Sequence, residues 1–218
     1  MLNYLVFPLP VILQVLAWVG GGVLGTTLIG AIIGALLPKN AKSIAIFGSK
    51  GAGKSTLWKQ LKGEFEDKAY HPTLATETID QFTVECNGMT KTIKKSADFG
   101  GDDHLVKRYE EIIEDKTFIY YLIDLTKLKE FKKETRSRLQ AISKVLEKHK
   151  IDTGLKLVGT HYEEFKNTMG CSRDEAKKLL AESIGLNNIK DIKIDDNIII
   201  AELTDRNDVK QILEQIIA

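Results

Sequence analysis

The sequence predicts a three-layer α/β domain with a mostly parallel six-stranded sheet, preceded by one transmembrane helix. From residue 43 onward, short apolar runs alternate with longer amphipathic stretches, a pattern typical of strands alternating with helices. One Asn-Gly pair, Asn87-Gly88, gives a single strong hairpin signal, so most strands are separated by helices and run parallel. All Lys, Arg, Asp and Glu residues follow Pro38. The chain is therefore divided into an uncharged membrane anchor, residues 1–38, and a folded domain, residues 39–218.

The predicted membrane helix lies within residues 11–37, where no side chain is more polar than Gln or Thr. A helix of this length would be about 40 Å long, which exceeds the roughly 30 Å hydrocarbon core of a bilayer. A secretory signal peptide fits poorly, because no basic residue precedes the segment and its apolar core is too long. Lys39 and Lys42 follow directly, so the positive-inside rule places the folded domain in the cytoplasm. The alternative is a hydrophobic helix buried in the protein or in a partner.

Glycine recurs in this segment, and its positions suggest two further hypotheses, one about self-association and one about topology. Two pairs have the G-x-x-x-G spacing that lets helices approach closely in lipid: Gly21 with Gly25, and Gly30 with Gly34. They favour a homo-oligomer formed through the glycine-rich helix, although transmembrane helices are in general rich in glycine. Residues 20–22 could also form the bend of a hairpin that enters the bilayer from one side, with arms at residues 2–19 and 23–37.

The first elements of the folded domain are a strand, a helix and a hairpin. Residues 43–47 form a compact β-branched run, followed by a glycine-rich loop and a helical stretch over residues 54–63. The runs at 81–86 and 90–97 flank Asn87-Gly88 and are predicted to pair as a hairpin.

The remainder of the chain alternates helices with strands. In order, we expect a helix at 104–114, a strand at 118–125, a helix at 130–149, a strand at 156–160, a helix opened by Ser172, a strand at 198–203 and a final helix to residue 218. Glu175 stands three residues after Ser172, which is the spacing of a capping box. A parallel sheet of this kind is covered by helices on both faces.

Composition excludes several classes of protein. The net charge is +1 and 28% of residues are charged, which argues against a disordered chain and against a basic nucleic-acid binder. Cys86 and Cys171 stand far apart, and the four histidines show no metal-ligand spacing, so neither a disulfide framework nor a zinc site is indicated. No nucleic acid is expected as a partner.

A phosphate-binding loop is predicted between the first strand and the first helix. Residues 48–55 read Gly-Ser-Lys-Gly-Ala-Gly-Lys-Ser and match G-x-x-x-x-G-K-[ST] at every fixed position. The backbone N–H groups of such a loop face the β-phosphate, while Lys54 reaches the β- and γ-phosphates and Ser55 contacts Mg²⁺. The predicted nucleotide contacts here are Gly48, Ser49, Lys50, Gly51, Ala52, Gly53, Lys54, Ser55 and Thr56.

Two further motifs follow this loop: His71-Pro72-Thr73 in an extended segment and Asp98-Phe-Gly-Gly101 after the hairpin. With them, residues 42–218 resemble the small Ras-like GTPase superfamily, most closely its Arf, Sar, SRP-receptor-β and Roc-like branches. The resemblance implies GTP or GDP as ligand, with Mg²⁺ held by Ser55, Thr73 and Asp98. It also implies that the N–H of Gly101 contacts the γ-phosphate and that both segments order around GTP.

The base-reading motifs match the family less closely. Where relatives carry [NT]-K-x-D, this chain has Thr160-His161-Tyr-Glu163, and where they carry S-A-[KL], it has Ala201-Glu202-Leu203. The resemblance places Thr160, His161, Glu163, Glu202 and Leu203 at the base, with the stem of His161 covering it and GTP favoured over ATP. Glu163 is one methylene longer than the usual Asp, and Glu202 replaces a small residue. The alternative is that both are charged residues in solvated loops.

The candidate catalytic residues are Asp102 and His104. Asp102 occupies the position where relatives carry the Gln that orients the attacking water, and His104 follows two residues later. A γ-phosphate repels an anionic side chain, so Asp102 is a poor replacement for Gln. We therefore expect slow intrinsic GTP hydrolysis that needs a partner or a dimer to complete the site.

Together these features predict a membrane-anchored small GTPase, acting as a GTP/GDP switch on the cytoplasmic side. Membrane lipid would bind residues 11–37, and the GTP form would recruit or release an unidentified protein effector. The alternatives are a nucleotide-binding pseudo-GTPase, a membrane scaffold without turnover and a P-loop ATPase.

Overall fold

The computed structural model describes residues 41–64, 76–99, 103–151, 154–186, 189 and 197–217. The predicted anchor, Thr73, Gly101 and Asp102 lie outside these residues, as does the side chain of His104. Within the described ranges, no helix has both the length and the apolar composition needed to cross a bilayer.

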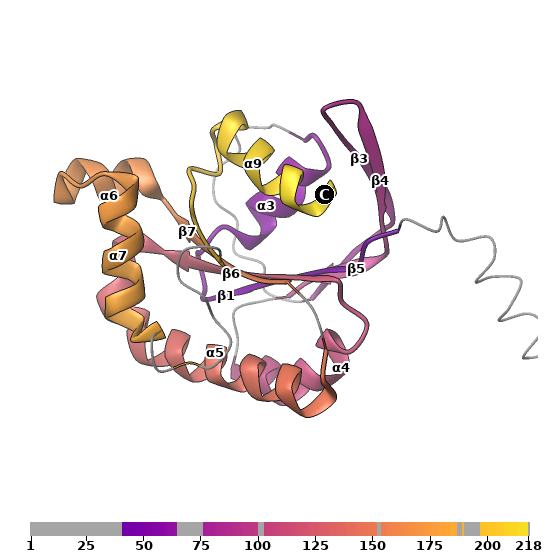
Figure 1. Cartoon of the computed structure of the whole chain (residues 1–218), viewed down its shortest axis with the longest axis horizontal. Helices are drawn as coiled ribbons and strands as arrows, with labels where there is room; N and C mark the ends of the chain where they lie inside the picture. Colours follow the sequence, from indigo (N-terminus) through magenta and orange to yellow (C-terminus); the bar gives the residue numbers. More distant parts are fainter. Residues whose placement is uncertain are drawn as a thin grey trace, which may run out of the picture. The chain divides into compact units, whose positions relative to one another are not determined.

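A four-stranded parallel sheet forms the centre of the domain, in the order β1-β6-β7-β8 (Figure 1). Its strands are β1 (Ile44–Gly48), β6 (Phe118–Asp124), β7 (Gly154–Thr160) and β8 (Ile198–Ile200). Nearly all of their side chains are buried, because helices cover both faces of the sheet.

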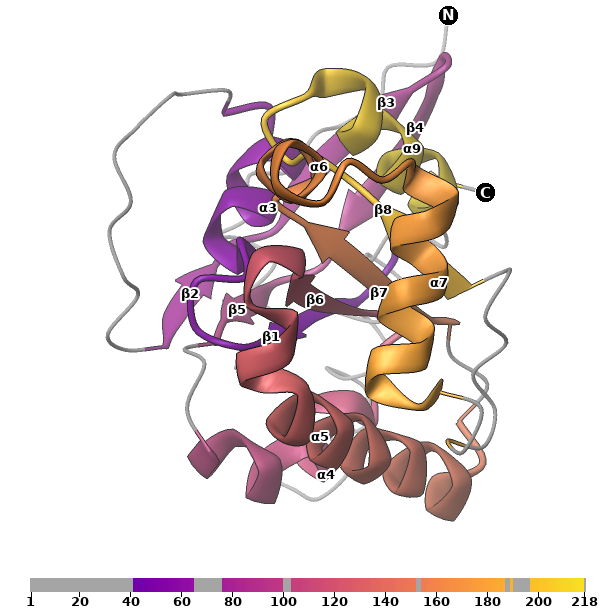
Figure 2. The ribbon, with the colours of Figure 1, turned by 90° about the vertical axis from the view of Figure 1, so that its left-hand side faces the viewer.

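Two layers of helices enclose this sheet (Figures 1 and 2). On one face lie α3 (Lys54–Leu61) and α9 (Arg206–Ile217), and on the other lie α4 (Tyr109–Ile113), α5 (Leu128–His149) and α7 (Arg173–Ile184). Side chains alternate between the faces: Ile44 and Ile46 pack in the cluster with α3 and α9, whereas Ala45 and Phe47 pack in the other. The predicted three-layer α/β architecture is confirmed.

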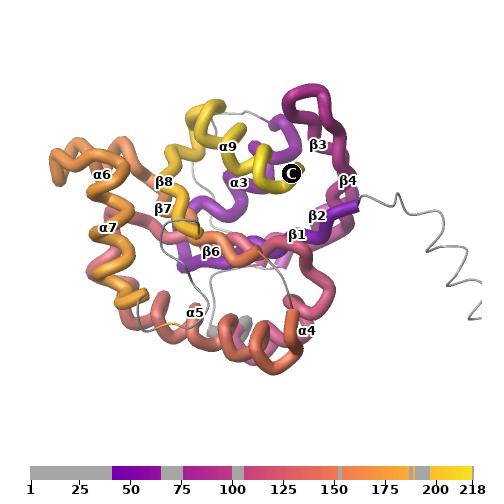
Figure 3. The backbone as a smooth tube through the Cα atoms, viewed as in Figure 1, coloured from indigo at the N-terminus to yellow at the C-terminus, as the bar shows by residue number. Residues whose placement is uncertain are grey.

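Two antiparallel strand pairs adjoin β1. The hairpin of β3 (Phe82–Cys86) and β4 (Met89–Ile93) turns at Asn87-Gly88 as predicted, with positive φ at both turn residues. It lies beside α9 (Figure 3), where Asn87 Nδ2 donates a hydrogen bond to Glu214 Oε1 at 2.9 Å. The second pair joins β2 (Glu77–Ile79) to β5 (Ser96–Asp98).

The prediction of six strands in one sheet is wrong for the described residues. The strand expected at 90–97 breaks after Ile93, because Lys94 N–H donates to Lys42 O at 2.9 Å and the chain leaves the hairpin. Residues 96–98 then pair with β2, which the sequence did not indicate. β8 ends at Ile200 rather than at residue 203, because the chain turns there toward α9.

The remaining differences concern helices. The helix expected at 104–114 begins as the 3₁₀ helix η1 (Asp103–Arg108) and continues as α4. A short helix, α6 (Tyr162–Met169), follows β7 and was not predicted. The capping box is confirmed, because Ser172 Oγ accepts from Glu175 N–H and Glu175 Oε2 accepts from Ser172 N–H.

Candidate functional site

The phosphate-binding loop leads from β1 into α3, in the context that the motif requires. Gly48 has a φ of 149°, and a Cβ at this position would collide with the backbone oxygen of Leu122 on β6. Gly53 has a φ of 86° and is the N-cap of α3. Both conformations strongly favour glycine, which explains the first and last fixed glycines of the motif.

Lys54, the first residue of α3, folds back over the loop. Its side chain is buried, and Nζ donates to Gly48 O at 3.0 Å and to Ser49 O at 2.9 Å. The ammonium group therefore lies next to the N-terminus of a helix, where the helix dipole also attracts an anion. The loop thus has the charge and the geometry to bind phosphate.

The other loop residues differ in their exposure to solvent. Ser49 and Ala52 are buried, Lys50 is exposed at the loop tip, and Ser55 and Thr56 are half-buried in the first turn of α3.

Two of the three predicted metal ligands are described, and they come from adjoining elements. Ser55 lies in the first turn of α3, and Asp98 is the buried last residue of β5, which contacts α3. A hydroxyl and a carboxylate are oxygen donors of the kind that Mg²⁺ prefers. The residues present therefore fit Mg²⁺, and the role of Thr73 stays a prediction.

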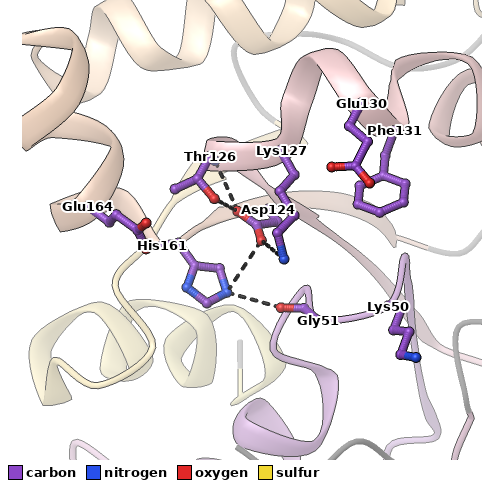
Figure 4. Close-up of a pocket in the computed structure, with 9 residues that line it drawn as sticks. All are labelled: Lys50, Gly51, Asp124, Thr126, Lys127, Glu130, Phe131, His161 and Glu164. Carbon is purple, nitrogen blue, oxygen red and sulfur yellow. Dashed lines mark hydrogen bonds and ion pairs between the residues drawn. The ribbon is translucent and has the colours of Figure 1, made fainter.

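Two consecutive residues at the end of β7 hold two consecutive carbonyl groups of the loop. The buried Thr160 Oγ1 lies 3.1 Å from Ala52 O and 3.3 Å from Ile123 O. His161 Nε2 lies 3.1 Å from Gly51 O (Figure 4). Because a carbonyl oxygen only accepts, Nε2 carries the proton in this contact. These bonds fasten the loop carbonyls of Gly51 and Ala52.

Asp124, the last residue of β6, supports the same corner and was missed by the sequence reasoning. Its buried carboxylate accepts from Thr126 N–H at 2.9 Å and from Thr126 Oγ1 at 2.6 Å. Lys127 Nζ lies 3.5 Å and His161 Nε2 3.9 Å from its other oxygen (Figure 4). An acid that closes a strand with no other charged residue and precedes Thr by two residues was the available signal.

A cavity of about 420 Å³ opens beside this corner (Figure 4). It is lined by Lys50, Gly51, Asp124, Thr126, Lys127, Glu130, Phe131, His161 and Glu164.

The structure brings the two predicted base-reading segments together. Glu163 N–H donates to Glu202 Oε2 at 3.3 Å, and this contact links the start of α6 to the loop after β8. Leu203 in the same loop packs against Gly53, where an added Cβ would lie 2.7 Å from Leu203 Cδ1. The base-reading loops and the phosphate loop therefore form one continuous site.

Arg173 also supports this site and was not singled out from the sequence. Its guanidinium lies 4.5 Å from the ring centroid of Tyr162, donates to Ile200 O and donates to Asp208 Oδ2 at 2.8 Å. The same Asp208 oxygen accepts from Glu202 N–H at 2.7 Å. Its only sequence signal was its place as the first helical residue after Ser172, inside the capping box, which does not show what the side chain reaches.

Comparison with known proteins points to one family. The model of the ADP-ribosylation factor family matches residues 30–218. No curated protein matches the chain.

Proposed function

The chain belongs to the ADP-ribosylation factor family of small GTPases, and we propose that it is a membrane-anchored GTP/GDP switch that binds guanine nucleotide with Mg²⁺ and hydrolyses GTP slowly. One observation supports nucleotide binding above all. Lys54 Nζ donates to Gly48 O and Ser49 O at the N-terminus of α3. In the same loop, His161 holds the carbonyl group of Gly51 and Thr160 holds that of Ala52.

Phosphate binding would use groups that are already in place. The loop N–H groups and the N-terminus of α3 would surround the β-phosphate. Lys54 would exchange its two carbonyl acceptors for phosphate oxygens, which are stronger acceptors because they are charged. This exchange needs only a small movement of a side chain that already lies over the loop.

Mg²⁺, when bound, would neutralise charge on the β- and γ-phosphates. Ser55 would supply its hydroxyl and Asp98 would act through a bound water, as the family resemblance implies. Asp98 stands at the end of β5, three residues before Gly101, whose N–H is predicted to contact the γ-phosphate.

Slow hydrolysis is proposed because of the residues at positions 102 and 104. Asp102 is anionic and would be repelled by the γ-phosphate, while His104 stands two residues beyond the water-orienting position. A partner, or a second copy of the chain, would then be needed for rapid turnover.

Membrane attachment is proposed through residues 11–37, because this apolar segment is long enough to span a bilayer. The positive charges directly after it favour a cytoplasmic position for the folded domain, where a protein effector would bind.

The test is nucleotide binding by the full-length chain in detergent micelles. Guanine nucleotide should copurify with the wild type and should bind with a defined Kd in calorimetry. Lys54→Ala should lose this binding, whereas Lys59→Ala, an exposed lysine on the same helix, should keep it. ATP or ADP in place of guanine nucleotide would support the ATPase alternative, and no nucleotide at all would support the scaffold.

A further inference from the structure

We propose that Glu202, rather than Glu163, supplies the carboxylate that recognises the N1–H and 2-amino group of guanine. The inference rests on the proposed function, because it concerns which residue gives that site its preference for one base.

The Glu163 side chain pairs with a residue of its own helix. Its Oε2 lies 3.8 Å from Lys166 Nζ on the same helix, and its side chain is 53% exposed. What Glu163 gives to the base-reading region is its backbone N–H, which donates to Glu202. An exposed pair of this kind is weak and leaves the carboxylate poorly placed for selective recognition.

Glu202, in contrast, is held between the two base-reading loops. Its Oε2 accepts from Glu163 N–H at 3.3 Å, and its Oε1 accepts from Thr204 Oγ1 at 3.0 Å and from Thr204 N–H at 3.5 Å. A carboxylate offers about four acceptor positions. One position is therefore open, and the contact at 3.5 Å is long enough to be replaced by a base N–H.

The backbone of Glu202 is fixed as firmly as its side chain. Glu202 N–H donates to Asp208 Oδ2, which is itself held by Arg173. This bond leaves the next amide, that of Leu203, as the donor for the carbonyl oxygen of guanine; within the described residues no hydrogen bond engages it. Since Leu203 packs against Gly53, a base read by this loop would lie next to the phosphate loop.

These groups match the edge of guanine. The carboxylate of Glu202 would accept the two N–H donors at N1 and C2, while Leu203 N–H would donate to the carbonyl at C6. Adenine has an unprotonated N1 and no amino group at C2, so it would face the carboxylate without a donor. The resulting unpaired charge would exclude adenine nucleotides.

Exchange of the carboxylate for an amide tests the assignment, because it changes which base fits. The amide of Glu202→Gln has one acceptor and one donor, which suits xanthine, where a C2 carbonyl replaces the amino group. Calorimetry on the full-length chain in micelles should show that Glu202→Gln weakens GDP binding by about tenfold to a hundredfold and tightens binding of xanthosine diphosphate by a similar factor. Glu182→Gln, an exposed surface change on α7, is the matched control.

The comparison with Glu163→Gln decides the proposal. If the gain in xanthosine diphosphate binding appears in Glu163→Gln and not in Glu202→Gln, the assignment to Glu202 is wrong although the guanine-nucleotide function stands. A wild-type chain that binds neither GDP nor GTP would overturn both. Circular dichroism of each variant, compared with the wild type, separates a change of preference from a loss of folding.

Discussion

Thr160 Oγ1 lies 3.1 Å from the carbonyl oxygen of Ala52, a contact between residues 108 positions apart that joins the end of β7 to the phosphate loop. Both residues are buried, so the carbonyl has no access to bulk water at this point. A buried carbonyl without a donor is costly. The threonine therefore contributes to the stability of the loop as well as to its shape.

Replacement of this threonine by valine should loosen the loop. Thr160→Val keeps the side-chain volume but removes the hydroxyl, so we expect unfolding free energy to fall by about 1–3 kcal/mol and GDP to dissociate faster. Denaturant unfolding and stopped-flow release of a fluorescent GDP measure the two effects. Thr160→Ser keeps the hydroxyl and should stay close to the wild type in dissociation rate. Equal rates for the valine and serine variants would show that the hydroxyl does not hold the loop.

Gly48 gives a prediction about stability alone. Gly48→Ala should destabilise the domain by about 3 kcal/mol, because the new methyl group meets the backbone oxygen of Leu122 in a conformation that alanine rarely adopts. Gly63→Ala is the matched control, since its φ is also positive, at 80°, but nothing lies within 4 Å of the added carbon. Thermal melts should rank the wild type above Gly63→Ala and Gly63→Ala well above Gly48→Ala. Similar melting temperatures for the two variants would contradict the collision.

Local chemistry explains which parts of the fold were predictable. The Asn87-Gly88 turn and the capping box at Ser172 depend on neighbouring residues, and both formed as the sequence indicated. The break after Ile93 was not predictable, because it depends on Lys42, far away in the sequence.

The contrast between features set by neighbouring residues and features set by distant ones also holds for the candidate site. The phosphate loop is a contiguous motif, so its place between β1 and α3 was predictable. Arg173 was missed because it works through Ile200 and Asp208 on other elements. Asp124 bonds to the neighbouring Thr126, so its local pattern was available, but its contact with His161 was not. The resemblance implied that the stem of His161 covers the base; the structure shows in addition that its ring nitrogen Nε2 lies 3.1 Å from Gly51 O. No pattern within the motif Thr160-His161-Tyr-Glu163 indicates that contact.

The capping box predicts how stability depends on pH. Hydrogen bonds from the backbone N–H and then the hydroxyl of Ser172 lower the pKa of Glu175 below its usual value of 4.5. Because the folded pKa is lowered, this contribution to stability is present above about pH 4.5 and is lost as the pH falls through the folded pKa.

We therefore expect the difference in thermal stability between the wild type and Ser172→Ala to become smaller as the pH is lowered below the usual pKa of Glu175. Thermal melts of both proteins between about pH 3 and 7 measure the difference, and the comparison cancels other groups that titrate in this range, such as Glu110, whose pKa is lowered by Lys148 and His149. A difference that stays constant across the range would mean that the Ser172 hydroxyl does not stabilise the Glu175 carboxylate, because the backbone N–H of residue 172 bonds to it in both proteins.

Removal of Mg²⁺ should accelerate nucleotide release, because Ser55 and Asp98 fit the metal together with phosphate oxygens. Metal and nucleotide bound at adjoining positions stabilise each other, and couplings of this kind commonly change affinity by about tenfold or more. We expect excess EDTA to speed GDP release from the wild type by such a factor. Ser55→Ala should release GDP quickly in Mg²⁺ as well, so that EDTA changes its rate little, whereas Thr83→Ala, an exposed change on β3, should respond like the wild type. A full EDTA response in Ser55→Ala would remove this hydroxyl from the metal site and leave Asp98, acting through a bound water, as the described residue that would hold the metal.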